Sequence, residues 1–124
     1  EFRRVLFRSE SANPFAWKAV RASMGSILRL PVARLSSPDE AVALARGSGG
    51  RVVAAVPRDG VRPEQVAWAG RVALALGGEG AGLSPTLIAS SDATVSIPMR
   101  HPVESLNVAA AGAILLYAAS RQRP

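Results

Sequence analysis

The sequence contains no cysteine and a single histidine, His101. The lack of cysteine excludes disulfide bonds, thiolate nucleophiles and cysteine-ligated zinc from this chain. One histidine also argues against a histidine-based metal site, so we expect no bound metal. The redox compartment stays open without cysteines to report on it, and cytoplasmic localisation is the default expectation.

Long hydrophobic runs and aromatic residues are also scarce. The longest apolar run, residues 108–119, is interrupted by Gly112 and is far shorter than the roughly 20 residues that a membrane-spanning helix needs. The N-terminus lacks the apolar stretch of a signal peptide, and we expect no membrane association. Apolar residues make up 48% of the chain but aromatics only 5%. Alanine, valine and leucine therefore supply the apolar surface, which favours helices packed on a sheet.

Acidic residues are too few to balance the basic ones. Fourteen arginines and one lysine stand against nine acidic residues and give a formal net charge of +6. Residues 1–9, EFRRVLFRS, hold three of these arginines and are unlike the rest of the chain, so we interpret them as a non-native scar or tail and set them aside from the fold. The rest leans modestly toward polyanions such as RNA, and a solvated surface with scattered arginines is the plainer alternative.

Strand-like and helix-like segments alternate along the remaining chain. Short strands are expected at residues 27–32, 51–57, 72–80 and 94–98; helices or helical turns are expected at 13–25, 37–47, 63–70, 84–92 and 105–122. In the last helix, the spacing predicts one buried face formed by Leu106, Ala110, Ala113, Leu116 and Tyr117. With 124 residues, the order predicts one compact α/β domain with a mainly parallel sheet flanked by helices.

Two strand ends carry unusual residues where an α/β sheet binds its ligands. After the strand at 72–80, four glycines (Gly77, Gly78, Gly80 and Gly82) surround Glu79. Their spacing matches neither a dinucleotide fingerprint nor a phosphate-binding P-loop. A plain tight turn is the alternative, but it does not explain Glu79, because a carboxylate in such a loop needs a positive or hydrogen-bonding partner when it is buried.

The second such end is IPMRHPVESLN, which leads into the last helix. Ser105 or Asn107 could simply cap that helix, and Glu104 could favour its dipole. Capping explains one polar residue there, and this junction has three. His101 is most simply a loop residue, and with no nucleophile-elbow serine the sequence gives little support to a hydrolase triad.

Three blocks of this sequence resemble the SpoU-type (TrmH-like) RNA 2′-O-methyltransferases of the SPOUT superfamily. They are NPFAWKAVRASMGSILRLPV, LALGGEGAGLS and SIPMRHPVESLNVAAAGAILLYAASRQR, and the match runs from about Ser11 to Arg123. The resemblance implies a SPOUT fold whose C-terminal part forms a trefoil knot, a homodimer built through the knot region, and a tRNA or rRNA substrate. It assigns residues 10–124 to a methyltransferase domain that lacks its first strand and helix.

The resemblance also implies that S-adenosylmethionine binds in the knot. The cofactor-binding residues would be Leu76, Gly77, Gly78, Glu79, Gly80, Leu83, Ile97, Pro98, Met99, Ser105, Leu106 and Asn107. Of these, Glu79, Ser105 and Asn107 would also serve catalysis by positioning the methyl donor and the target ribose. Arg21, in the block KAVRASMG, could contact RNA phosphate, and a structural hydrogen bond to a neighbouring loop is its alternative role.

One part of the family pattern is missing. An upstream N-x-G-x-x-x-R block, whose arginine is thought to help activate the ribose hydroxyl, has no counterpart here, and Arg3, Arg4 and Arg8 do not sit in a matching motif. This departure keeps a second hypothesis open, a non-catalytic RNA-binding or dimerisation module with the same knotted fold. A nucleotide-binding oxidoreductase has only the glycine loop in its favour.

Overall fold

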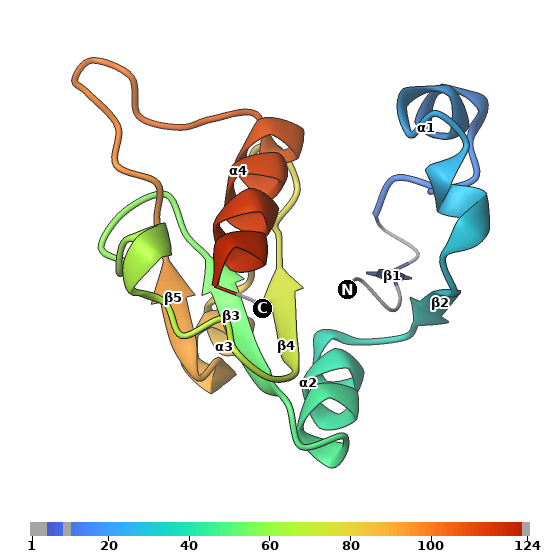
Figure 1. Ribbon diagram of the computed structural model, residues 1–124, viewed down its shortest axis with the longest axis horizontal. Coiled ribbons are helices and arrows are strands. Elements are labelled where there is room, and N and C mark those ends of the chain that lie inside the picture. The colour runs from blue at the N-terminus through green and yellow to red at the C-terminus, as the bar shows by residue number, and fades with distance from the viewer. Residues whose placement is uncertain (1–4, 9–10, 123–124) are drawn as a thin grey trace. The chain divides into compact units, whose positions relative to one another are not determined.

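The computed structural model describes residues 5–8 and 11–122, which fall into two compact units, one ending at Ala41 and the other starting at Val42 (Figure 1). The strands are β1 (Val5–Arg8), β2 (Val32–Leu35), β3 (Arg51–Ala55), β4 (Val72–Ala75) and β5 (Ala93–Val95). The α-helices are α1 (Trp17–Ala22), α2 (Pro38–Gly47), α3 (Pro85–Ser90) and α4 (Val108–Arg121), with short 3-10 helices η1 (Ser26–Arg29) and η2 (Pro63–Gln65).

The first unit pairs β1 with β2 in parallel, with Val5 opposite Val32. Residues 5–8 lie in the stretch that was set aside in the sequence analysis, and the structure uses them as a strand. The strand expected at residues 27–32 is wrong in place, because η1 occupies 26–29 and β2 starts only at Val32. The reason is a turn: Met24 and Gly25 both have positive φ, and the Ser23 hydroxyl accepts a bond from Ile27 N–H, which starts a helical turn instead.

The second unit is built on a three-stranded parallel sheet in the order β4-β3-β5. As the central strand, β3 has both faces covered, and its Val52, Val53 and Ala54 are all buried. Apolar runs without alternation are typical of such doubly covered strands. The expectation of a parallel sheet flanked by helices is confirmed, although the three strands of this unit are shorter than the apolar runs that predicted them.

The two faces of this sheet carry two separate core clusters, because neighbouring residues of β3 point to opposite sides. Val53 packs with Val66, Trp68, Val95 and Leu115, which places α4 on that side. Val52 packs with Val42 of α2 and Leu87 of α3 on the other side. One compact domain was predicted from the sequence, and in the described part of the chain both clusters lie in the second unit.

The helices predicted from caps are present. Ser37 precedes α2 and its hydroxyl accepts a bond from Glu40 N–H, and Ser84 caps α3 by accepting from Leu87 N–H. The predicted helical turn in residues 63–70 is η2, whose Pro63 carbonyl accepts the buried indole N–H of Trp68 at 2.7 Å. The end of α4 is tied to this region, since Gln122 accepts from Trp68 N–H and donates to the Glu64 carbonyl.

The buried face predicted for the last helix is wrong. The structure buries Gly112 and Leu115 of α4, leaves Leu116 half-buried, and exposes Ala110, Ala113 and Tyr117, as well as Leu106 in the segment before the helix. This helix is apolar on nearly every side, so hydrophobic periodicity alone could not select the face that meets the sheet. As a result, a second apolar stripe, which includes Ile114 and Tyr117, remains on its surface.

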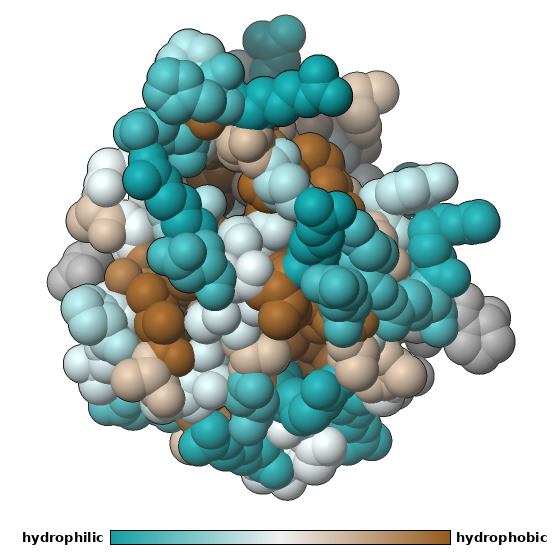
Figure 2. Space-filling view, turned by 90° about the vertical axis from the view of Figure 1, so that its left-hand side faces the viewer, coloured by the Kyte–Doolittle hydropathy of each residue, from teal (hydrophilic) through white to brown (hydrophobic). Residues whose placement is uncertain are grey.

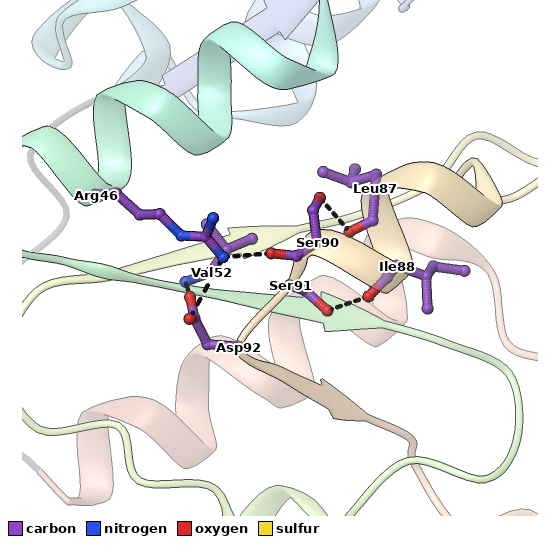
Figure 3. A network of polar contacts seen from close by, with 7 residues as sticks. All are labelled: Arg46, Val52, Leu87, Ile88, Ser90, Ser91 and Asp92. Atoms are coloured by element: carbon purple, nitrogen blue, oxygen red, sulfur yellow. Dashed lines mark hydrogen bonds and ion pairs between the residues drawn. The ribbon is translucent and has the colours of Figure 1, made fainter.

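A small polar network fastens the amino ends of the strands (Figure 3). The Asp92 carboxylate, just before β5, accepts a 2.8 Å bond from Val52 N–H of β3. Arg46 of α2 lies 3.5 Å from Asp92 and donates to the Ser90 carbonyl at 2.6 Å. This network joins α2, β3 and the end of α3, away from the loops at the carboxyl ends of the strands. Among the residues that the structure describes, no helix has the length and apolar character to cross a membrane.

Candidate functional site

Three loops meet the carboxyl edge of the β4-β3-β5 sheet, because parallel strands end on the same side. They are residues 56–62 after β3, residues 76–84 after β4, and residues 96–107 between β5 and α4. In Figure 1 the last of these is a long loop that projects beyond β5 before it returns to the start of α4. Open α/β sheets bind ligands at this edge.

The glycine loop after β4 closes tightly on itself. Gly78 and Gly82 form an antiparallel bridge, with Gly82 N–H donating to the Gly78 carbonyl at 3.2 Å. A Cβ on Gly77 would lie 2.6 Å from Gly82 Cα, and Gly80 has a φ of 102°. Larger residues cannot occupy Gly77 without displacing backbone, so this loop presents backbone atoms to its surroundings in a fixed arrangement.

Glu79 and Asn107 are brought together from opposite sides of the site. The Asn107 side-chain Nδ2 donates a 2.7 Å hydrogen bond to Glu79 Oε1, and both side chains are exposed. The Oδ1 atom of Asn107 accepts from Ala109 N–H at 2.9 Å and Ala110 N–H at 3.4 Å, which makes Asn107 the N-cap of α4. Asn107 therefore caps α4, which was one of its alternatives in the sequence analysis, and its side chain also contacts Glu79 of the glycine loop.

Ser105 and Leu106 lie in the exposed segment just before α4. Within the described part of the chain, no hydrogen bond is recorded for the Ser105 side chain, so its hydroxyl is available to a ligand. Leu76, at the end of β4, lies over α4, since a Cβ on the buried Gly112 would come within 3.1 Å of Leu76 Cδ1. The glycine loop and the start of α4 therefore form one continuous surface.

A cavity of about 380 Å³ opens between the loops after β3 and β5. Its walls are Pro57, Arg58 and Asp59 on one side and Ser96, Ile97, Pro98, Met99, His101, Val103 and Glu104 on the other. Figure 2 looks onto the side of the molecule that is at the left of Figure 1 and shows apolar surface exposed between hydrophilic side chains. The volume lies in the range of small-molecule sites.

The loop after β3 is held against the chain following β5. Gly60 N–H donates to Ser96 Oγ, and the same hydroxyl donates to the Gly60 carbonyl. A Cβ on Gly60 would lie 2.6 Å from the backbone of Val95 and Ser96. Farther out, the guanidinium of Arg58 forms an ion pair of 2.6 Å with Glu104.

The predicted site residues thus do not all lie together. Glu79 and Asn107 touch one another; Ile97, Pro98 and Met99 line the cavity. Leu83 instead packs against the cluster of α2 and α3. Arg21 belongs to the other unit, where its guanidinium stacks 5.8 Å from the ring centroid of Trp17. The sequence analysis missed Pro57, Arg58 and Asp59, whose only signal was that VPRDG follows a predicted strand at the ligand-binding edge.

RNA methyltransferases are among the known proteins that this chain resembles. An uncharacterized tRNA/rRNA methyltransferase of Mycobacterium tuberculosis is 39% identical over 122 residues, covering 94% of this chain and 42% of the relative. The Bacillus subtilis 23S rRNA guanosine 2′-O-methyltransferase RlmP is 32% identical over 113 residues, covering 91% of this chain and 45% of the relative. The chain spans about two fifths of the length of the curated relatives that it matches.

Solved structures agree with these sequence matches. The crystal structure of an AdoMet-bound rRNA methyltransferase from Sinorhizobium meliloti superposes with a TM-score of 0.86 at 32% identity, covering 96% of this chain and 46% of that one. The model of the SpoU rRNA methylase family matches residues 1–117 of the sequence. With the two motif loops joined through Glu79 and Asn107, the chain belongs to the SpoU rRNA methylase family.

Proposed function

We propose that this chain forms the cofactor-binding and catalytic part of an RNA methyltransferase that methylates a ribose 2′-hydroxyl with S-adenosylmethionine. The observation that supports this most directly is the Glu79–Asn107 hydrogen bond, which couples the glycine loop to the segment carrying Ser105. The ribose 2′-hydroxyl as target is supported by RlmP, whose name states this specificity. The cofactor is supported by the AdoMet-bound relative of Sinorhizobium meliloti.

The residues present fit this cofactor. Its adenosine needs an apolar cleft with backbone polar groups, and the cavity walls offer Ile97, Pro98 and Met99. Its sulfonium is positively charged, and the exposed carboxylate of Glu79 would favour that charge nearby. Gly77, Gly78, Gly80 and Leu76 would bring backbone close to the ligand, while Leu106, Ser105 and Asn107 would complete the binding set. When bound, S-adenosylmethionine supplies a methyl group that the sulfonium has already activated.

The chain's own task in the reaction is alignment. A ribose hydroxyl must be held in line with the methyl group, and its proton must leave as the new bond forms. We assign Ser105 and Asn107 to this alignment, because they stand at the junction of the glycine loop and α4. The Asn107 Nδ2 group donates to the Glu79 carboxylate. This bond would keep the glycine loop and the segment before α4 at a fixed spacing when the ligand enters.

The RNA substrate is proposed to be structured tRNA or rRNA. Without residues 1–9, twelve basic residues still stand against eight acidic ones, and this positive balance supports a polyanionic partner. Arg21 is the proposed RNA contact, since its exposed guanidinium stacks on the indole of Trp17 and the two could meet phosphate and base together. Replacing Arg21 with alanine should then weaken RNA binding at low salt and leave the affinity for S-adenosylhomocysteine unchanged.

We further propose that the C-terminal region is knotted and that two copies associate through it. The exposed stripe of α4 with Ile114 and Tyr117 supports such a contact, because a two-fold dimer needs one self-complementary apolar surface. A crystal structure of the chain would trace whether α4 passes through the preceding loop.

We also propose residues 10–124 as the methyltransferase domain and residues 1–9 as a non-native tail. A variant starting at residue 10 should then bind S-adenosylhomocysteine as the whole chain does.

The decisive experiment is a calorimetric titration of S-adenosylhomocysteine into the 124-residue chain. We expect one site per chain at micromolar strength, and a weaker site in the Glu79→Gln variant. Glu64→Gln is the matched control, because Glu64 is also exposed and lies in η2, outside the glycine loop. A folded chain without binding would contradict the proposal and favour the non-catalytic RNA-binding or dimerisation module.

A further inference from the structure

We infer that Arg58 is a positioning residue for the proposed methyl-transfer site, acting through Glu104 on the segment that carries Ser105. This rests on the proposed methyltransferase function. The loop between β5 and α4 must hold Ser105 in place although it has no regular structure. A site built on a loop of this kind needs outside support to keep its geometry.

The segment of residues 98–106 forms few hydrogen bonds or ion pairs with the rest of the described chain. Its one recorded backbone hydrogen bond, Val103 N–H to the Arg100 carbonyl, is internal to the segment. It is anchored at its start by Ser96 on Gly60 and Val61, and at its end by Asn107 on Glu79. Between these anchors, and within the described residues, the Arg58–Glu104 pair is the only hydrogen bond or ion pair recorded from the segment to another part of the chain.

Arg58 is well suited to this task by its place. It lies in the loop after β3, and that loop is fixed to the sheet edge by the close contact of Gly60 with Val95 and Ser96. The pair therefore connects a firmly held loop with a weakly held one. Glu104 is the residue directly before Ser105, so any displacement of Glu104 is passed to Ser105 along one peptide unit.

The distance and surroundings of the pair also matter. At 2.6 Å the contact is a close ion pair, although both side chains are largely exposed, at 63% and 71%. Both residues line the cavity together with Met99 and Val103. The pair thus joins the two walls of the cavity, because Arg58 belongs to one wall and Glu104 to the other.

An exposed pair contributes little energy, which sets the size of the expected effect. Removing Arg58 should weaken S-adenosylhomocysteine binding roughly two- to fivefold. A control with the same chemistry is present in the chain: Arg62 pairs with Glu64 at 3.9 Å with similar exposure, but the two residues are close neighbours and tie no loop to the segment. Arg62→Ala therefore removes an exposed arginine and leaves the Arg58–Glu104 pair intact.

The test combines hydrogen exchange with calorimetry on the whole chain. Arg58→Ala and Glu104→Ala should each speed amide exchange in residues 98–106 and weaken S-adenosylhomocysteine binding, and the double variant should be no worse than the poorer single one. The swapped pair, Arg58→Glu with Glu104→Arg, should restore both readouts, which a merely structural role for either residue would not predict. Arg62→Ala should change neither.

Two results would overturn the inference: exchange and affinity in Arg58→Ala equal to those of Arg62→Ala, or a swapped pair that rescues nothing. Failure of the proposed function is distinguishable from these. If the wild-type chain binds no S-adenosylhomocysteine, the cofactor proposal fails, and exchange in the unliganded chain still decides about Arg58. Faster exchange in residues 98–106 would then support its positioning role, and unchanged exchange would overturn it.

Discussion

At the residue scale, Gly77 carries the tightest steric constraint of the glycine loop. Gly77→Ala would force a Cβ into the backbone of Gly82, and overpacking of this kind costs about 1–3 kcal/mol. We expect urea unfolding to show this loss, together with weaker S-adenosylhomocysteine binding. The control is Gly47→Ala at the end of α2, where a Cβ meets nothing within 4 Å. That variant should be neutral or stabilised by up to about 1 kcal/mol; equal behaviour of the two would refute the argument.

Asp92 gives a prediction about pH. The bond from Val52 N–H holds the pKa of the Asp92 carboxyl below its ordinary value of 3.8, with help from Arg46, although desolvation acts in the other direction. A lowered folded-state pKa stabilises the protein above pH 3.8, and this stabilisation disappears as the pH falls through the lower folded-state value. Asp92→Asn keeps an oxygen for Val52 and removes the titration. The acid-side slope of unfolding free energy should flatten, and an unchanged slope would count against this role.

Glu40 also contributes to the acid-side slope of the unfolding free energy. Its pKa is lowered by the backbone N–H of Ser36, then by the Ser36 hydroxyl, so it contributes acid sensitivity of the same sign. Some slope should therefore survive in Asp92→Asn, and less in the variant that also carries Glu40→Gln.

At the element scale, the start of α4 separates two roles of one side chain. Asn107→Ala removes the N-cap and should cost about 1 kcal/mol of stability in urea unfolding. Asn107→Asp keeps a capping oxygen and favours the helix dipole, but it loses the donor and places a negative charge beside Glu79. We expect this variant to lose S-adenosylhomocysteine affinity while keeping most of its stability. If affinity instead follows stability, so that Asn107→Ala loses both and Asn107→Asp keeps both, the cap alone matters.

How far the elements could be predicted from sequence depended on local signals. Ser37 before Pro38 and Ser84 before Pro85 marked the starts of α2 and α3, and β3 was found from an unbroken apolar run. The face of α4 could not be found, because alanines surround the helix and only contact with Val53 and Val95 selects Leu115. Arg58 was missed for the same kind of reason: its partner Glu104 is distant in sequence and meets it only in the folded chain.

At the scale of the whole molecule, the apolar stripe on α4 predicts self-association. Ile114→Arg should shift the chain from the mass of two copies toward one in light scattering coupled to size exclusion, since it places a charge in the proposed interface. Leu44→Arg on α2 is the control, because Leu44 is a similarly exposed leucine on another helix. A mass that neither substitution changes would argue against the α4 contact.

The double use of Asn107 restricts what chemistry position 107 can accept. One planar group there must offer an oxygen to the helix and an N–H to Glu79 at the same time. Aspartate has the oxygen without the donor, serine is too short to span both, and glutamine adds a methylene that shifts the group outward. The amide also has a single workable orientation, since turning it over would set N–H against N–H and oxygen against carboxylate. Slow deamidation of this one side chain would therefore break the contact with Glu79 in a protein that keeps its helix cap.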